Sequence, residues 1–209
     1  MSKRPPEEPR ARRREILEIA ARLICVQGYD GTSIQDIAQA CDLTKAGVYH
    51  YFDSKEALLA EIMNYGMDLF EEQVLSQVGD IADPVERLKT CMEKNITLVT
   101  RGWSKEVTII LHEHATLRGP AGKKINARKK RYVTFLERSF QEAIDAGLIR
   151  PVSAKVAAFG FLGMVLWIYK WYRADGALGD EQIAAGMIDL LFTGLETPRP
   201  RRAGKEKSR

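Results

Sequence analysis

Residues 29–58 read YDGTSIQDIAQACDLTKAGVYHYFDSKEAL, and this segment decides the fold of the N-terminal part of the chain. Thr32 or Ser33 can cap a short helix, and residues 41–43 can form a tight turn. Thr44 can cap a second short helix directly after that turn. Two helices joined in this way form a helix-turn-helix, whose second helix lies in the major groove of DNA. The segment therefore predicts a DNA-binding unit.

The second helix of this unit starts with short side chains, which allow its backbone to approach the base edges. We expect Lys45 to donate to guanine or to phosphate, and Tyr49 and Tyr51 to bind phosphates on either side of the groove. Thr32 and Lys55, at the starts of their helices, are expected to hold the DNA backbone. The alternative is that the aromatic residues only form a small core. The predicted DNA-binding residues are Thr32, Ser33, Thr44, Lys45, Ala46, Gly47, Tyr49, His50, Tyr51 and Lys55.

Helix start and stop signals recur along the whole chain, and no segment shows the sustained alternation of a strand. A first helix is expected from about Arg12 to Gln27, before Gly28. Later helices are expected to open at Ser54, Pro84, Ser104, near Gly119, at Ser153 and near Asp180. We predict an all-α fold of nine helices. Its parts are a flexible basic arm (1–11), a helix-turn-helix domain (12–53), a helical ligand-binding and dimerisation domain (54–197) and a basic flexible tail (198–209).

The ends of the chain are basic and its middle is mildly acidic. The net charge over 209 residues is +4, while residues 1–14 carry six Lys/Arg and two Glu, and residues 199–209 carry six Lys/Arg and one Glu. Basic ends are compatible with nucleic-acid binding without establishing it. No signal peptide is recognisable, so we expect a cytoplasmic protein. The three cysteines are scattered and odd in number, which argues against a disulfide or zinc framework.

An apolar run from Val156 to Tyr169 is the one candidate membrane segment, but Lys170 interrupts it before it is long enough to span a bilayer. A helix that is apolar on all sides in a soluble protein must be buried on all sides. We therefore expect the core on one side of it and a partner subunit on the other, with no membrane partner.

The N-terminal motifs resemble those of a known family. Asp36-Ile37-Ala38, residues 43–52 (LTKAGVYHYF) and residues 54–58 (SKEAL) resemble the N-terminal signature of TetR-type transcriptional regulators, over roughly residues 12 to 65. The resemblance implies an Ω-shaped, all-helical homodimer on a palindromic DNA operator. It also implies a repressor released by a small effector, and no enzyme. Asp42 stands where this family usually has Gly, and the order Ala46-Gly47 is also unusual.

Residues 161–178 resemble the dimerisation helix of TetR-type repressors that control fatty-acid, phenylacetate or steroid breakdown and respond to acyl-CoA thioesters. This resemblance implies dimerisation through the last two helices and an acyl-CoA effector, with no cofactor. Basic side chains beside aromatic ones would suit the phosphates and adenine of CoA. The acyl chain would need an apolar cavity, for which Trp103, Phe135, Phe159 and Met164 are candidates. The predicted ligand-binding residues are Trp103, Arg128, Arg131, Phe135, Phe159, Met164, Trp167, Lys170, Trp171 and Arg173.

Alternatives remain open at this point. The basic residues of the 120–146 helix can simply form a solvated face, and the aromatic helix can simply be the dimer core. Two functions other than an acyl-CoA-responsive repressor stay open. One is a repressor of a drug-efflux operon that senses lipophilic cations, and the other is a helical acyl-binding protein or enzyme. No nucleophile–base pair or phosphate-binding loop supports catalysis. His112-Glu113-His114 lacks a third ligand in register, so no metal is expected.

Overall fold

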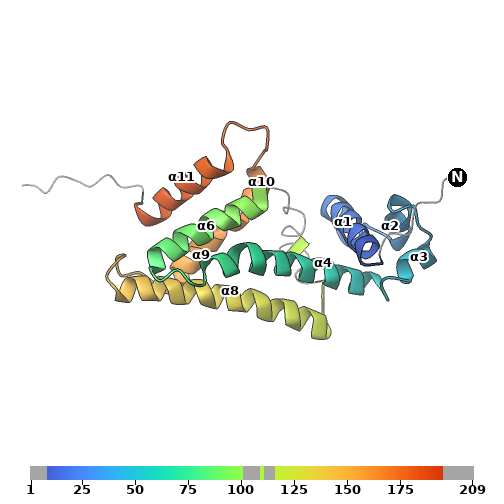
Figure 1. The fold of residues 1–209 in the computed structure, drawn as a ribbon, viewed down its shortest axis with the longest axis horizontal. Helices are drawn as coiled ribbons and strands as arrows, with labels where there is room; N and C mark the ends of the chain where they lie inside the picture. Colours follow the sequence, from blue (N-terminus) through green and yellow to red (C-terminus); the bar gives the residue numbers. More distant parts are fainter. Residues whose placement is uncertain (1–8, 101–108, 111–115, 195–209) are drawn as a thin grey trace, which may run out of the picture.

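The computed structural model describes residues 9–100, 109–110 and 116–194, and this part of the chain is helical with connecting turns. The predicted all-α fold is therefore confirmed. Figure 1 shows α1 to α3 at one end of an elongated molecule, with α4 running from them into a helical body. The elements are α1 (Pro9–Gln27), α2 (Ile34–Ala40), α3 (Lys45–Tyr49), α4 (Lys55–Phe70), the π-helix η1 (Glu71–Leu75), α5 (Ser76–Val78), α6 (Pro84–Thr100), α8 (Gly119–Asp145), α9 (Ala154–Leu166), α10 (Ile168–Trp171) and α11 (Asp180–Phe192).

The helix count is close to the prediction. Because η1 and α5 continue α4, and α10 follows α9 after one residue, the described helices correspond to eight of the nine predicted. The ninth, predicted to begin at Ser104, lies outside the described residues apart from Ile109 and Ile110, which are helical. The π-helix is a finding that no sequence pattern predicted. Such wide turns inside α-helices are frequent at functional sites.

The N-terminal unit is held together by an apolar core and by local caps. Ile16, Ile37 and Val48, from the first three helices, are fully buried against Leu58 of α4. Asp42, in the turn between α2 and α3, has a φ of +54°, in the left-handed region that its sequence position predicted. The turn needed for a helix-turn-helix is therefore made by Asp in place of the usual Gly.

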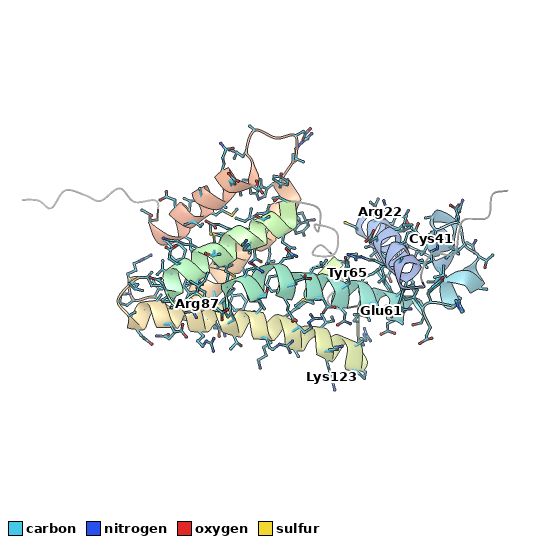
Figure 2. All side chains as sticks on the ribbon, in the orientation of Figure 1. Arg22, Cys41, Glu61, Tyr65, Arg87 and Lys123 are labelled. Carbon is cyan, nitrogen blue, oxygen red and sulfur yellow. The ribbon has the colours of Figure 1, made fainter. Side chains whose placement is uncertain are left out.

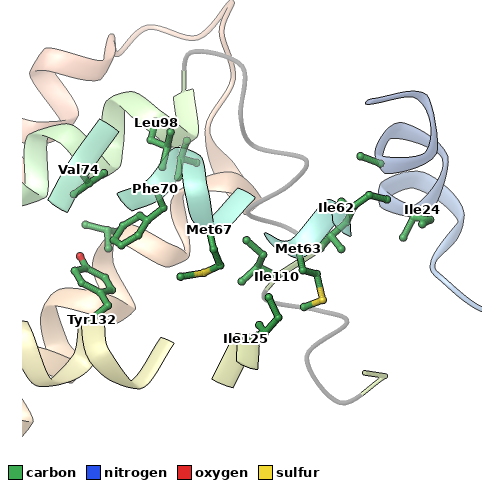
Figure 3. Packing of buried hydrophobic residues seen from close by; sticks show 14 of the residues in the cluster. Ile24, Ile62, Met63, Met67, Phe70, Val74, Leu98, Ile110, Ile125 and Tyr132 are labelled. Carbon is green, nitrogen blue, oxygen red and sulfur yellow. The ribbon is translucent and has the colours of Figure 1, made fainter. Parts of the chain in front are cut away.

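The core of the body lies between α4, α6, α8 and α9. In Figure 3, Phe70 of α4 lies against Tyr132 of α8, and their ring centroids are 4.5 Å apart in an edge-to-face arrangement. Phe140 of α8 and Phe161 of α9 form a second aromatic pair, with centroids 6.4 Å apart. Figure 2 shows Arg87 of α6 where that helix meets α8, and its guanidinium pairs with Glu142. The far half of α4 is thus built into the body.

The apolar helix near the C-terminus is divided in two at Trp167, and its second part ends at Trp171. By length and composition, residues 154–171 could cross a membrane. One face of α9 nevertheless belongs to the core: Ala158, Phe161, Leu162 and Val165 are buried. Its opposite face is exposed in the single chain, as expected for a helix that packs on a partner subunit.

Candidate DNA-binding face and ligand cavity

The two short helices of the N-terminal unit are capped as their sequence predicted. The hydroxyl of Ser33 accepts a hydrogen bond from the backbone N–H of Asp36 at 3.1 Å, and the Asp36 carboxylate accepts one from the Ser33 N–H at 2.7 Å. The Thr44 hydroxyl accepts from the Gly47 N–H at 3.0 Å and opens α3. Ser33 and Thr44 therefore fix where each helix begins, and both are exposed.

Most of the residues of α3 that were predicted to bind DNA lie on its outer surface. Lys45 and Ala46 are exposed, and Tyr49 is 43% exposed although it is a large aromatic residue. The ring of His50 is exposed and lies edge-on to Tyr51, with centroids 5.3 Å apart. Because α3 is short, its backbone can approach the base edges. The Tyr49 hydroxyl and the Lys45 ammonium can then hydrogen-bond to phosphates.

Three of the predicted DNA-binding residues are partly or fully buried and make contacts within the N-terminal unit. Thr32 is fully buried, and its hydroxyl donates to the Gly28 carbonyl at 2.8 Å. The ammonium of Lys55 donates to the Tyr29 carbonyl at 2.5 Å and lies 4.0 Å from the centroid of the Tyr29 ring. Tyr51 is half-buried and packs on the core. For Thr32 and Lys55 the structure replaces the expected phosphate contact with an internal one, because each side chain folds back onto the α1–α2 connection.

Two arginines of α1 connect the N-terminal unit to α4 through hydrogen bonds. Neither of them was identified from the sequence as a functional residue. Arg13 donates to Glu61 at 3.0 Å and to the Tyr51 carbonyl, and its guanidinium lies 4.4 Å from the centroid of the Phe52 ring. Arg14 donates to the Tyr65 hydroxyl at 2.5 Å. Figure 2 shows Glu61 and Tyr65 on the part of α4 that passes beside α1. A movement of α4 must therefore carry the helix-turn-helix with it.

A cavity of about 220 Å³ opens beside α4 in the body. Its volume exceeds the roughly 150 Å³ of an apolar cavity that admits benzene and lies below the roughly 300 Å³ at which drug-sized pockets begin. It can therefore enclose a small apolar group but no large ligand. The lining residues are Gly66, Met67 and Phe70 of α4, Asn95, Leu98 and Val99 of α6, the isolated helical residue Ile110, Lys129, Tyr132 and Val133 of α8, and Leu162 and Leu166 of α9.

Polar groups of the cavity lie in two places. The Asn95 amide donates to the Tyr132 hydroxyl at 2.9 Å, and the Cys91 sulfur lies 3.6 Å from the same hydroxyl. Burial raises the pKa of the Tyr132 phenol and raises the pKa of the Cys91 thiol to about 11, so both stay protonated at neutral pH. Elsewhere, the ammonium of Lys129 donates to the Ile110 carbonyl at 2.6 Å. Lys129 is the one charged side chain in the described lining.

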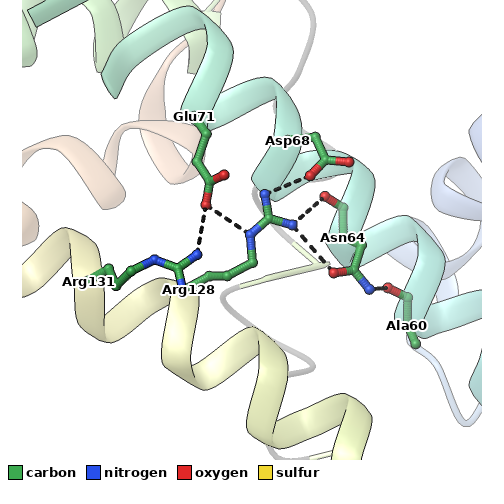
Figure 4. Close-up of polar contacts among 6 residues, drawn as sticks. All are labelled: Ala60, Asn64, Asp68, Glu71, Arg128 and Arg131. Carbon is green, nitrogen blue, oxygen red and sulfur yellow. Dashed lines mark hydrogen bonds and ion pairs between the residues drawn. The ribbon is translucent and has the colours of Figure 1, made fainter. Parts of the chain in front are cut away.

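The basic residues predicted to bind the ligand's phosphates lie on the α4 side of α8. The guanidinium of Arg128 is buried and donates to Glu71 at 2.9 Å, to Asp68 at 2.6 Å and to the Asn64 carbonyl at 3.2 Å. Arg131 is exposed and reaches Glu71 at 3.4 Å (Figure 4). Arg128 therefore holds α4 and η1 on α8, and the sequence pattern did not reveal that carboxylates of these two helices would face it.

The aromatic and apolar ligand candidates are placed away from the cavity. Phe159, Trp167 and Trp171 are exposed on α9 and α10, and Met164 and Phe135 are only partly buried. Lys170 and Arg173 are exposed, and Arg173 pairs with Asp175. Trp103 and the His112-Glu113-His114 run lie outside the described residues. The cavity has a different lining because the face of α9 that packs toward α6 and α8 carries Ala158, Phe161, Leu162 and Val165, whereas Phe159 and Trp167 lie on its exposed face.

A pH prediction follows from the network around Arg128. A hydrogen bond from Arg128 lowers the pKa of the Glu71 carboxyl in the folded protein. The stability that this carboxylate contributes is therefore fully present above about pH 4.3, the pKa of a glutamate in the unfolded chain. It is lost as the pH falls through the lower pKa of the folded state. In Glu71→Gln the free energy of unfolding should fall less steeply with acidification than in the wild type. Denaturant unfolding between pH 7 and pH 3 at fixed protein concentration measures this, with the exposed neighbour Glu72→Gln as control. Equal slopes would contradict it.

Two family models match the chain. The one described as bacterial regulatory proteins of the tetR family matches residues 16–62, and the one described as the tetracyclin repressor-like C-terminal domain matches residues 82–195. The chain therefore belongs to the TetR family. It is a DNA-binding transcriptional repressor, of a family whose members act as dimers, and not an enzyme. The division into domains at residues 53 and 54 stays a prediction.

Similar proteins include both sequence relatives and solved structures. The transcriptional repressor KstR2 of Mycobacterium tuberculosis strain H37Rv is 24% identical over 186 residues, which are 88% of this chain and 93% of that protein. The crystal structure of AibR with isovaleryl coenzyme A and operator DNA is 68% identical, covers 87% of this chain and 98% of that chain, and has a TM-score of 0.83. The TetR family regulator PfmR from Thermus thermophilus is 33% identical, with 87% and 99% coverage and a TM-score of 0.79.

Proposed function

We propose that this repressor is controlled by an acyl-CoA thioester with a short acyl group, and that it regulates a catabolic pathway in the cytoplasm. The observation that carries the proposal is the small apolar cavity between α4 and α8, with a single cation in its described lining. AibR, which shares 68% of its residues with this chain, was crystallised with isovaleryl coenzyme A. An acyl group of about five carbons, smaller than benzene, fits inside a cavity that exceeds the roughly 150 Å³ of one that holds benzene.

The cavity does not suit the lipophilic cations that efflux repressors sense. A buried cation needs a carboxylate partner, since an unpaired charge in an apolar site costs several kcal/mol. The described lining contains no Asp or Glu, and its one charged residue is Lys129. A cationic ligand would meet a like charge there.

The location of the cavity supports control of DNA binding. Gly66, Met67 and Phe70 of α4 line it, and Arg13 and Arg14 tie the preceding part of the same helix to the N-terminal unit. A ligand that fits one position of α4 better than another changes the spacing of the two α3 helices in the dimer. It shifts operator affinity by no more than its own differential affinity for the two arrangements.

The proposal is tested by measuring operator affinity with and without ligand. A duplex selected from random sequences by the wild-type chain serves as the operator, and fluorescence anisotropy reports binding. AibR was crystallised with isovaleryl coenzyme A and DNA together, so a graded effect is expected in place of complete release. Isovaleryl-CoA should weaken operator binding about 5- to 150-fold, the usual range of allosteric coupling.

Thermodynamic linkage between the two ligands supplies a control. If isovaleryl-CoA weakens operator binding by a given factor, the operator must weaken isovaleryl-CoA binding by the same factor. Free CoA, isovalerate and the lipophilic cation tetraphenylphosphonium serve as comparison ligands. An effect of tetraphenylphosphonium alone, with none from any acyl-CoA, would show that the chain belongs with the efflux repressors.

A further inference from the structure

Within the part of the chain that the structure describes, Lys129 is a cation without a counter-ion beside an apolar cavity. Its ammonium uses one of three donors on the Ile110 carbonyl, and no carboxylate pairs with it among the described residues. Burial lowers the pKa of Lys129, which reflects the cost of taking its charge out of water. A ligand oxygen at this position would offset part of that cost.

The cavity has a charged end and a closed end. Figure 3 shows Ile110, whose carbonyl binds Lys129, on one side of Met67, and Tyr132 with Phe70 on the other. Lys129 is only partly buried, whereas Asn95 and Tyr132 are buried. The charged end therefore lies nearer to solvent, and the Asn95–Tyr132 end is the floor.

Most hydrogen-bonding groups at the floor are engaged with one another. The Tyr132 hydroxyl accepts from the Asn95 amide nitrogen and contacts Cys91, and the same nitrogen also donates to the Cys91 carbonyl at 2.7 Å. The floor therefore presents mainly the ring faces and aliphatic side chains around these groups. An apolar group fits such a floor, because a polar one would find few free partners.

We propose that the acyl chain enters first, that its terminal carbons lie against Phe70 and Tyr132, and that its thioester carbonyl oxygen accepts a hydrogen bond from Lys129. This assignment rests on the proposed function and adds to it the orientation of the ligand and the residue that recognises the acyl carbonyl. Benzene in a cavity of roughly 150 Å³ corresponds to roughly 25 Å³ per carbon, so about 220 Å³ holds roughly nine carbons. Acyl chains of about twelve or more carbons therefore exceed the space, and the bulk of CoA lies outside.

The experiment compares Lys129→Met with Lys130→Met, the adjacent exposed lysine of α8. The full-length dimer is titrated calorimetrically with isovaleryl-CoA, dodecanoyl-CoA, free CoA and isovalerate. Lys129→Met keeps an unbranched side chain, shorter by the terminal nitrogen, and removes its charge. It should weaken isovaleryl-CoA binding about 10- to 100-fold, the cost of losing a hydrogen bond to a charged group. Free CoA should change less than about twofold, and Lys130→Met should match the wild type. In the wild type, dodecanoyl-CoA should bind at least about 10-fold more weakly than isovaleryl-CoA, because its acyl chain exceeds the cavity.

The outcomes separate the two proposals. If isovaleryl-CoA binds the wild type and Lys129→Met equally, or if Lys129→Met weakens free CoA as strongly, Lys129 does not recognise the acyl carbonyl and the assignment is wrong. If isovalerate binds as tightly as the thioester and depends on Lys129, a carboxylate and not a thioester is the ligand. If no acyl-CoA binds the wild type, the proposed function itself fails. Unchanged operator affinity of ligand-free Lys129→Met shows that the variant is folded.

Discussion

Tyr49→Phe should weaken operator binding by about 10²- to 10⁴-fold. The substitution removes only the hydroxyl of Tyr49 on α3, a residue that is 43% exposed, and it keeps the ring and whatever the ring packs on. A hydrogen bond to a charged phosphate contributes about 1.5–3 kcal/mol, and the dimer makes the contact twice, which gives about 3–6 kcal/mol. Anisotropy titration of the selected operator at fixed salt measures the loss, and size-exclusion chromatography checks that the dimer is intact.

For Lys45, also on α3, the salt dependence of operator affinity distinguishes a contact with phosphate from a contact with a base. If Lys45 binds one phosphate in each half-site, Lys45→Ala should lower the slope of log affinity against log salt by about two, because each neutralised phosphate contributes about 0.9. Tyr49→Phe should leave this slope unchanged. Lys123→Ala, an exposed lysine of α8, controls for net charge. Operator affinity that is insensitive to Tyr49→Phe would remove α3 from the DNA-binding face.

The helix-turn-helix could be predicted because it is encoded by neighbours in the sequence. Ser33, Thr44 and Ser54 each cap a helix that begins at the next residue, and Asp42 adopts the left-handed turn next to them. These interactions span three or four residues, so their residue types alone specify them. The core positions followed from the helical period.

The cavity could not be predicted because it is built from four helices that are far apart in the sequence. Arg128 and Lys129 show the difficulty: they are adjacent, but successive helical residues point about 100° apart. Arg128 faces Asp68 of α4 and Glu71 of η1, and Lys129 faces the cavity. A basic residue next to an apolar face is ambiguous until the opposing helix is known. One sequence feature could have indicated the cavity: the polar residue Asn95 lies within the otherwise mainly apolar buried face of α6.

The dimer interface gives the second large effect. Val156, Gly160, Gly163 and Trp167 follow one another at four- and three-residue spacing, with Phe159 beside them, and all five are exposed in the single chain. A Cβ added at Gly160 or Gly163 would have no atom within 4 Å. An exposed apolar face with two glycines is typical of a surface that a second helix approaches closely, because isolated soluble chains seldom expose such a patch.

Gly163→Arg should therefore convert the dimer to a monomer without destabilising the chain. Within one subunit the arginine points into open space, and replacing a helical glycine improves helix propensity by up to about 1 kcal/mol. Across the interface the same side chain meets the partner's helix and buries a charge. Operator binding should fall about 10²- to 10⁴-fold, because two linked half-site contacts become independent.

Analytical ultracentrifugation measures the oligomeric state, and anisotropy titration measures operator binding. Ala127→Arg places the same side chain on the exposed surface of α8 and should leave both unchanged, which separates the effect of position from that of charge. Circular dichroism should show equal helix content in both variants. A Gly163→Arg chain that remains dimeric would place the interface away from this face of α9, and the apolar residues there would then require a different partner.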